Sequence, residues 1–251
     1  MEQTVVRIRT LEIGSGMPKI CVPIVGKTEK EILEGAERAK AAKPDLVEFR
    51  VDWYEEAADS KKVVALLEKL RKCLGELPVL FTFRSSREGG EAALNDGAYQ
   101  SLNEAAIASG FVDCVDVELF SGDAVVKAVV AEAHSNNVKV IASNHDFEKT
   151  PAAEELLARL QKMEALGADI PKIAVMPQSS KDVLTLLTVT ESWKETGKTP
   201  VITMSMAGEG LISRLCGEIF GSAVTFGAAG KSSAPGQIDA EELRRILEII
   251  H

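Results

Sequence analysis

Short apolar runs rich in β-branched residues alternate along the chain with longer segments of helical periodicity. The apolar runs cover residues 20–25, 46–51, 79–83, 112–119, 138–143, 170–176, 201–205 and 223–226. The helical segments cover residues 28–42, 61–74, 96–109, 123–136, 151–166, 181–196, 211–220 and 239–250. Strands that alternate with helices pair in parallel through helical crossovers, and near-continuous apolar strands are typical of a sheet covered on both faces.

Eight such units in a chain of 251 residues predict an α/β fold of the (β/α)8 TIM-barrel class, formed by a single domain over residues 1–251. The alternative is an open doubly wound sheet, in which a glycine-rich dinucleotide turn follows the first strand. Residues 25–28 read Val-Gly-Lys-Thr, without that pattern, so the barrel is favoured. An extra alternating segment at residues 5–13 is expected to form a β-hairpin that closes the N-terminal mouth of the barrel, its bottom.

Charge and composition narrow the classes of function. The formal net charge of −9 argues against nucleic acid as the main partner. No apolar run approaches the roughly 18 residues of a membrane span, and the N-terminus lacks the apolar block of a signal peptide. The four cysteines form no CxxC pair, which predicts reduced thiols in a cytoplasmic protein rather than disulfides or a zinc site.

Chemistry in such a barrel lies at the C-terminal ends of the strands and in the loops that follow them. The main polar residues predicted there are Glu48, Arg50, Asp52, Arg84, Glu88, Asp116, Glu118, His145, Lys172 and Arg214. The histidines show no HxH or HxxxH spacing, and arginines accompany the carboxylates, so no metal site is expected.

Lys172 is the candidate nucleophile. Strand alternation places it on one face with Ala174, and places Ile173 and Val175 on the other. In a closed barrel the branched pair packs against the helices, so Lys172 points inward. A desolvated amine near other cations loses affinity for its proton and can attack a ketone. The alternative is a lysine that reaches solvent from the end of its strand, which a sheet without an edge disfavours.

His145 follows the fifth predicted strand and is the candidate acid and base. A histidine just past a barrel strand is suited to proton transfer near neutral pH. The alternative is a loop histidine that is hydrogen-bonded to Asp146 or Glu148.

Three arginines, Arg50, Arg84 and Arg214, are predicted to lie at the top rim of the barrel. Together they indicate a small anion, a carboxylate or phosphate held by two hydrogen bonds. The alternative is that they form structural ion pairs with neighbouring carboxylates. Residues 227–237 are rich in Gly, Ser and Ala, which suits either a phosphate-binding loop or a lid that closes on a substrate.

Several short motifs, in this order along the chain, resemble the type I 3-dehydroquinate dehydratase family. The resemblance extends from about Lys19 to Gln237. The motifs are Glu48-Phe49-Arg50, Phe81-Thr82-Phe83-Arg84 with Glu88-Gly89-Gly90, Asp116-Val117-Glu118-Leu119-Phe120, Ser143-Asn144-His145-Asp146-Phe147, Lys172-Ile173-Ala174-Val175-Met176-Pro177, Ile212-Ser213-Arg214 and Ser233-Ala234-Pro235-Gly236-Gln237.

The resemblance implies a (β/α)8 barrel, usually dimeric, that removes water from 3-dehydroquinate by syn elimination to give 3-dehydroshikimate in the shikimate pathway. Its small-molecule partner is 3-dehydroquinate, and it needs no cofactor or metal. The roles implied are a Schiff base on Lys172, acid and base chemistry at His145 supported by Glu88, a substrate-carboxylate ligand at Arg214, ring-hydroxyl contacts from Glu48, Arg50 and Arg84, and a lid that carries Ser233 and Gln237.

The chain departs from the family pattern at two places. Ala207-Gly208 stands where members commonly have glycine first, in the loop that leads to Arg214, and Pro23 stands where some members have serine. Two other functions use the same fold: a Schiff-base aldolase that acts on a sugar phosphate, and a non-catalytic barrel that binds a small molecule.

Overall fold

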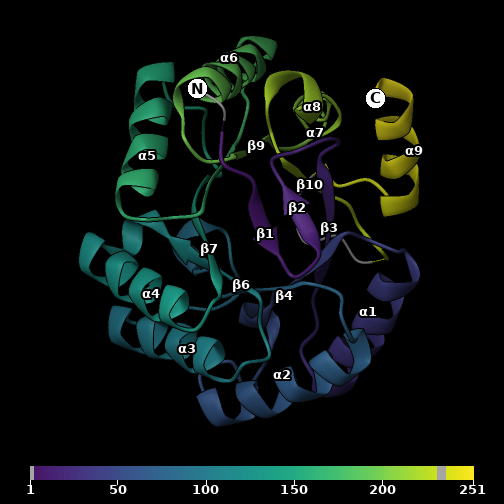
Figure 1. Ribbon diagram of the computed structural model, residues 1–251, viewed down its shortest axis with the longest axis vertical. Helices are drawn as coiled ribbons and strands as arrows, with labels where there is room; N and C mark the ends of the chain where they lie inside the picture. Colours follow the sequence, from purple (N-terminus) through teal and green to yellow (C-terminus); the bar gives the residue numbers. More distant parts are fainter. Residues whose placement is uncertain (1–2, 231–235) are drawn as a thin grey trace.

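A computed structural model describes residues 3–230 and 236–251. Within these residues a parallel sheet of eight strands forms the centre of the molecule (Figure 1). The strands are β3 (Lys19–Ile24), β4 (Leu46–Arg50), β5 (Val79–Thr82), β6 (Cys114–Glu118), β7 (Lys139–Asp146), β8 (Ile170–Val175), β9 (Ile202–Ser205) and β10 (Val224–Phe226). From β3 to β9 each strand pairs with the next along the chain, and β10 pairs with β3. A bridge between Val201 and Ser222 joins β9 to β10, so the sheet curves into the predicted barrel.

Helices surround the barrel on its outer side (Figure 1). They are α1 (Glu29–Ala41), α2 (Ser60–Leu74), α3 (Asp96–Ala108), α4 (Asp123–Ser135), α5 (Ala153–Ala165), α6 (Ser180–Thr196), α7 (Ile212–Leu215), α8 (Gly217–Phe220) and α9 (Ala240–Ile250). Three short 3-10 turns follow strands: η1 (Val51–Trp53), η2 (Ser86–Glu88) and η3 (Leu119–Ser121). Within the described ranges, no helix is long and apolar enough to cross a membrane.

The single helix predicted over residues 211–220 is wrong. The chain forms two four-residue helices there, with a turn at Cys216 between them. The backbone carbonyl of Arg214 accepts a hydrogen bond from the Thr225 hydroxyl (2.9 Å) on β10, so this carbonyl is turned toward the barrel. A Cβ on Gly217 would lie 2.7 Å from the Ser222 carbonyl oxygen, so only glycine permits this close approach.

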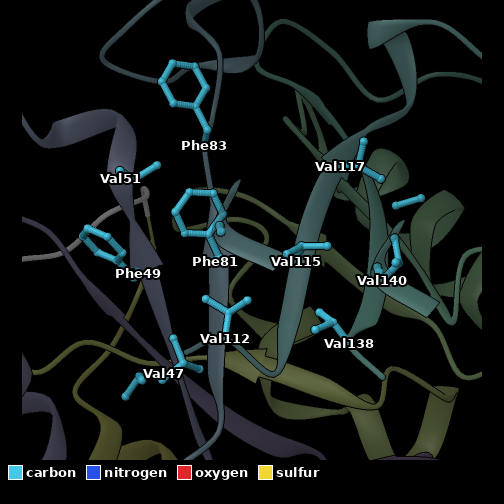
Figure 2. Packing of buried hydrophobic residues seen from close by; sticks show 14 of the residues in the cluster. Val47, Phe49, Val51, Phe81, Phe83, Val112, Val115, Val117, Val138 and Val140 are labelled. Atoms are coloured by element: carbon cyan, nitrogen blue, oxygen red, sulfur yellow. The ribbon is translucent and has the colours of Figure 1, made fainter. Parts of the chain in front are cut away.

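The main hydrophobic core lies between the outer face of the sheet and the helices. Val47, Phe49, Phe81, Val115 and Val140 are among its residues, on neighbouring strands (Figure 2). The rings of Phe49 and Phe81 pack edge to face at 6.2 Å between centroids. Residues of one strand that are two apart face the same side, so the residues between them point into the barrel.

A second apolar cluster fills the lower part of the barrel interior. Its members include Leu46, Leu80, Ile141 and Ile170 from the strands. The hairpin of β1 (Val6–Ile8) and β2 (Leu11–Ile13) adds Val6, Ile8 and Ile13 to the same cluster and lies across the barrel in Figure 1. The predicted closing hairpin is thus confirmed, and it shields the lower interior from water.

Candidate active site

Polar side chains replace the apolar ones above this lower layer, toward the C-terminal ends of the strands. Lys172 points into the barrel from β8, as strand alternation predicts, and its side chain is buried. Its Nζ lies 3.3 Å from Asp116 Oδ2 and 3.7 Å from Glu48 Oε1. It also lies 4.7 Å from the centre of the Phe226 ring. Two carboxylates and one aromatic face therefore hold the Lys172 nitrogen in place.

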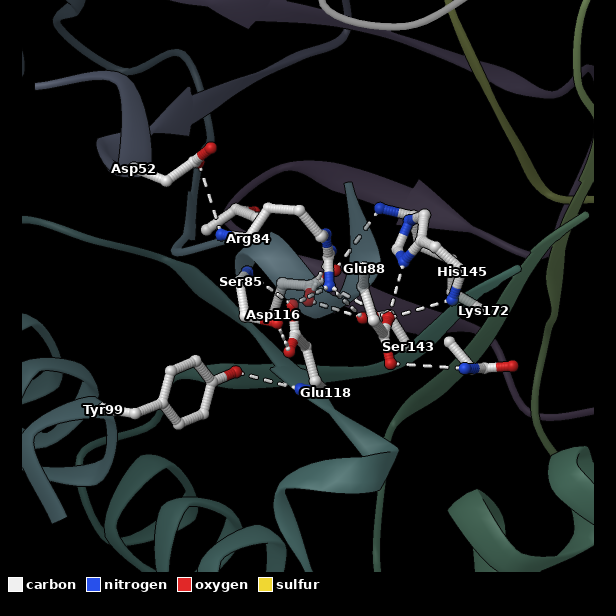
Figure 3. A network of polar contacts seen from close by, with 12 residues as sticks. Asp52, Arg84, Ser85, Glu88, Tyr99, Asp116, Glu118, Ser143, His145 and Lys172 are labelled. Atoms are coloured by element: carbon white, nitrogen blue, oxygen red, sulfur yellow. Dashed lines mark hydrogen bonds and ion pairs between the residues drawn. The ribbon is translucent and has the colours of Figure 1, made fainter. Parts of the chain in front are cut away.

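Arg84 crosses the barrel interior from the end of β5 and joins its strands together (Figure 3). Its guanidinium donates to Glu118 Oε1 (2.9 Å), Ser143 Oγ (3.0 Å) and Asp116 Oδ1 (2.8 Å). Burial opposes its charge, but the carboxylates, Asp116 first, raise the pKa of Arg84 well above its ordinary value. Burial alone would raise the pKa of Asp116, but Arg84 and Lys172 hold it below its usual value. The two residues form a fixed, fully ionised pair.

His145 and Glu88 form a second pair beside Arg84 (Figure 3). Glu88 Oε2 lies 3.0 Å from His145 Nδ1 and accepts the His145 backbone N–H at 2.9 Å. Burial, followed by the charges of Arg84 and Lys172, lowers the pKa of His145 well below its usual value. Burial raises the pKa of Glu88 to about 7 against the opposing effect of Arg84. At neutral pH the ring is therefore an uncharged base, with Nδ1 directed at the carboxylate.

Arg50 and Glu48 belong to β4 and are both buried. Arg50 donates from Nε and Nη2 to the two oxygens of Asp52, each at 2.8 Å. Glu48 Oε1 accepts a hydrogen bond from the Thr82 hydroxyl at 3.0 Å. For Arg50, and likewise for Arg84, the structure bears out the ion-pair alternative, since carboxylates already occupy the guanidinium groups.

Arg214 differs from these two arginines. Its side chain is almost fully buried, and burial lowers its pKa to about 10. Its Nη1 lies 3.7 Å from Met204 Sδ. The pKa values of Arg50 and Arg84 move in the opposite direction, because Asp52 and Asp116 support their charges. Arg214 is thus the arginine here whose charge an incoming anion would favour most.

A cavity opens above Lys172 and brings nearly all the predicted residues together. Its lining consists of Glu48, Arg50, Arg84, Glu88, Gly89, His145, Phe147, Lys172, Ala174, Met204, Met206, Arg214, Phe226 and Gln237. Ser233, predicted as part of the lid, lies outside the described residues. A buried amine, a neutral imidazole and a buried guanidinium therefore face one cavity.

The loop of Gly89 and Gly90 shapes one wall of this cavity. Gly89 has a φ of 80°, and a Cβ there would lie 2.3 Å from the Phe147 ring. A Cβ on Gly90 would lie 1.8 Å from the Arg84 carbonyl oxygen. Both positions require glycine, because the loop folds tightly back on the end of β5 and brings Glu88 against His145.

Three parts of the site differ from the sequence prediction or escaped it. His145 lies within β7, not past its end, because the strand continues and pairs His145 with Ala174. The contacts of Asp116 with Lys172 and Arg84 were not foreseen, although Asp116 itself was expected at the top of the barrel. The apolar lining residues Met204, Met206 and Phe226 were missed; the alternation of β9 and β10 was the signal that could have found them.

The unusual Ala207 does not displace Arg214 from the cavity. Ala207 has a φ of 57°, in the left-handed region where glycine is favoured. The loop before it stays attached to the barrel, since the Met206 N–H donates to the Val175 carbonyl at 2.8 Å. The chain accommodates alanine at this position by accepting a strained backbone.

The chain matches known proteins over almost its whole length. It is 57% identical over 244 residues to 3-dehydroquinate dehydratase of Listeria innocua, covering 97% of each chain. It is 54% identical to 3-dehydroquinate dehydratase of Bacillus subtilis, covering 98% of this chain and 97% of the other. A crystal structure of type I 3-dehydroquinate dehydratase from Clostridium difficile with covalently modified comenic acid superposes with a TM-score of 0.97 at 52% identity, covering 99% of this chain and 98% of that one. A family model described as Type I 3-dehydroquinase matches residues 20–251, and the chain belongs to this family.

Proposed function

We propose that this chain converts 3-dehydroquinate to 3-dehydroshikimate, as a hydro-lyase of the shikimate pathway, through an imine formed on Lys172. The observation that carries the proposal is the buried Lys172 amine, which faces one cavity with His145 and Arg214. The reaction must remove a proton next to a ketone, and such a proton is only weakly acidic. An iminium supplies the electron sink that this step needs.

In the first step the Lys172 amine attacks the ketone carbon C3, and the oxygen leaves as water. This attack requires the uncharged amine. The carboxylates of Asp116 and Glu48 lie 3.3 and 3.7 Å from Nζ. They keep the nitrogen directed at the cavity. The closed apolar layer beneath excludes water from below.

His145 then removes the C2 proton and later gives it to the leaving C1 hydroxyl. Its lowered pKa makes the ring a neutral base, and Glu88 on Nδ1 leaves Nε2 to take the proton. The electron pair of the C2–H bond moves into the iminium to give an enamine. Protonated His145 gives its proton to the C1 hydroxyl, which departs as water while the iminium re-forms. A second water molecule hydrolyses the iminium and releases the product from Lys172.

The other cavity residues orient the substrate ring. Arg214 is proposed to bind the ring carboxylate, because an anion would offset the burial of its charge. Glu48, Arg50 and Arg84 are proposed to contact ring hydroxyls while their ion pairs keep the site rigid. Gln237 lines the cavity mouth, and Ser233 is proposed to join it in the lid.

Reduction with borohydride tests the covalent step. Wild-type protein mixed with 3-dehydroquinate and borohydride is expected to gain the mass of substrate or product less one water plus two hydrogens, by intact-mass measurement. Lys172→Ala is expected to gain no such mass and to lose turnover while keeping its fold. Lys139→Ala is the matched control, because this lysine also lies on a strand but outside the cavity. Normal turnover by Lys172→Ala would overturn the proposal.

Residues 1–251 are proposed to act as a single barrel domain, and the chain is proposed to form a homodimer. Exposed apolar side chains on neighbouring helices, Leu184 on α6, Ile212 on α7 and Ile219 on α8, support an interface at this side of the barrel. Sedimentation analysis of wild type and Leu184→Glu tests it.

A cytoplasmic location is proposed as well, and the free thiols of the four cysteines support it.

A further inference from the structure

We propose that Asn144 and Arg159 are positioning residues, which hold Glu88, and through it the His145 imidazole, from the outer side of β7. Asn144 and His145 are neighbours on β7, so their side chains leave the strand on opposite faces. Both nevertheless reach the same carboxylate of Glu88. The inference deepens the proposed function, because it concerns the alignment of the base.

Asn144 uses both ends of its side-chain amide. Its Nδ2 donates to Glu88 Oε1 at 3.2 Å, and its Oδ1 accepts from Arg159 Nη1 at 2.5 Å. An amide that accepts from a guanidinium with its oxygen must present its N–H groups to the opposite side. Arg159 thereby fixes the orientation in which Asn144 donates to Glu88. The residue is buried, so water does not readily replace either contact.

Arg159 is itself held from several directions. It lies on α5, its Nη2 contacts Glu155, and its guanidinium lies 5.3 Å from the centre of the Phe120 ring. It lines a second hollow, which also reaches Asn144 and Glu88. Neither Arg159 nor Asn144 lines the cavity above Lys172. The pair therefore has no contact with a substrate in that cavity.

The consequence lies in how the Glu88 carboxylate is oriented. His145 binds Oε2 through its backbone N–H and Nδ1, and Asn144 holds Oε1, so the carboxylate is fixed at both oxygens. The charged groups that face Glu88 are Arg84 at 3.6 Å, Glu118 and, when protonated, His145. The bond from Asn144 favours the ionised carboxylate and so opposes the effect of burial on its pKa. Its loss would leave Glu88 freer to rotate and easier to protonate.

The test compares Asn144→Ala, Arg159→Met, Arg159→Lys and the double variant Asn144→Ala/Arg159→Met in steady-state kinetics across pH. Asn144→Ala and Arg159→Met are each expected to lower kcat about tenfold, the rate equivalent of one hydrogen bond to a charged group. KM should change less than about twofold, because neither residue contacts the substrate. The acid limb of the kcat profile should move to higher pH. Arg159→Lys keeps a cationic donor and should recover most of the rate.

The double variant decides whether Arg159 affects Glu88 only through Asn144. It should be no slower than Asn144→Ala alone, because Arg159 acts only through Asn144. Arg244→Met is the matched control: this arginine also leaves a helix to bind an acid, Asp45, away from the site. It should leave kcat and the pH limb unchanged even if it lowers the melting temperature.

The outcomes separate this inference from the proposed function. Single losses that multiply in the double variant, or variants that melt earlier but keep wild-type kcat and pH limb, would overturn the positioning role. If Asn144→Ala does not fold, the pair Arg159→Met and Arg159→Lys still decides the question. A wild-type protein that fails to turn over 3-dehydroquinate would overturn the proposed function instead, whatever the variants do.

Discussion

Two buried arginines of one cavity are expected to affect stability in opposite directions. Arg214→Met removes a guanidinium whose pKa burial has lowered from 12.5 to about 10. One pKa unit corresponds to about 1.4 kcal/mol, so the buried charge costs roughly 3 kcal/mol at neutral pH. This cost is fully present below pH about 10 and is relieved only above it. Methionine fills similar space without the charge, so Arg214→Met is expected to unfold later in urea than wild type, by about 1–3 kcal/mol.

Arg84→Met is the comparison that makes this prediction specific. Arg84 is as deeply buried, but its loss would leave Asp116 and Glu118 without their cation. Removal of one partner from a buried ion pair typically costs about 3–5 kcal/mol, so Arg84→Met is expected to be strongly destabilised.

Arg214→Met is expected to lower catalytic activity although it raises stability. The ring carboxylate would lose one or two charge-assisted hydrogen bonds of about 1.5–3 kcal/mol each, so kcat/KM should fall about 10²–10³-fold, mostly through KM. The absorbance of the conjugated enone product measures the rate, and urea unfolding at pH 7 measures stability. A variant at Arg214 that is destabilised like Arg84→Met, or that keeps its KM, would refute the reasoning.

Three further predictions concern the base, its carboxylate and a strained loop. His145→Ala should lower kcat by about 10²–10⁴ yet still give a borohydride-trapped adduct on Lys172; full activity would reassign the base. Glu88 ionises near pH 7 in the folded protein against an ordinary value of 4.5, so its ionisation lowers stability as pH rises between these values. The free energy of unfolding of Glu88→Gln, relative to that of wild type, should therefore be higher at pH 8 than at pH 5 in urea titrations. An equal difference at both pH values would contradict the raised pKa. Ala207→Gly should unfold later by about 0.5–1 kcal/mol with KM unchanged, because glycine relieves the left-handed φ of 57°; an earlier midpoint would show that this backbone is not strained.

The barrel and its inward lysine were predictable because both rest on local patterns. Runs of β-branched residues mark the strands, since each strand is covered by helices on one face and by the barrel interior on the other. Because Ile173 and Val175 were expected to pack outward against the helices, strand alternation was enough to place Lys172 inside. The hairpin at the bottom was predictable for the same reason, because its alternating pattern leaves one apolar face that needs a partner.

The end of β7 was not predictable from local pattern. Three polar residues, Asn144 to Asp146, are typical of a loop, yet they continue the strand and pair with β8. The partners that stabilise them, Glu88 and Arg159, come from other loops and helices. Because Asn144 and His145 are held by residues far away along the chain, this end of the strand gives no signal of its own in the sequence.

The ion-pair partners of the arginines differ in the same way: one is near in the sequence and the others are far away. Asp52 lies two residues from Arg50, so their ion pair was an open alternative from the sequence. The partners of Arg84 on β6 lie 32 and 34 residues away, and the sheet register that sets Thr82 beside Asp116 selects them. Sequence alone gave no reason to choose these carboxylates from among the many on the chain.

The charges of Arg84 and Arg214 are balanced differently, and this difference allows one cavity to be rigid and still bind a carboxylate. Arg84 is neutralised by the protein's own carboxylates, so its guanidinium fixes the strands around Lys172 and gains little from a ligand. Burial lowers the pKa of Arg214, so an incoming carboxylate would favour its charge. If this division holds, stabilising substitutions inside the barrel should concentrate at Arg214 and Glu88, and each should lower activity. A substitution at either position that raises both stability and turnover would show that the buried charges are not set for the reaction.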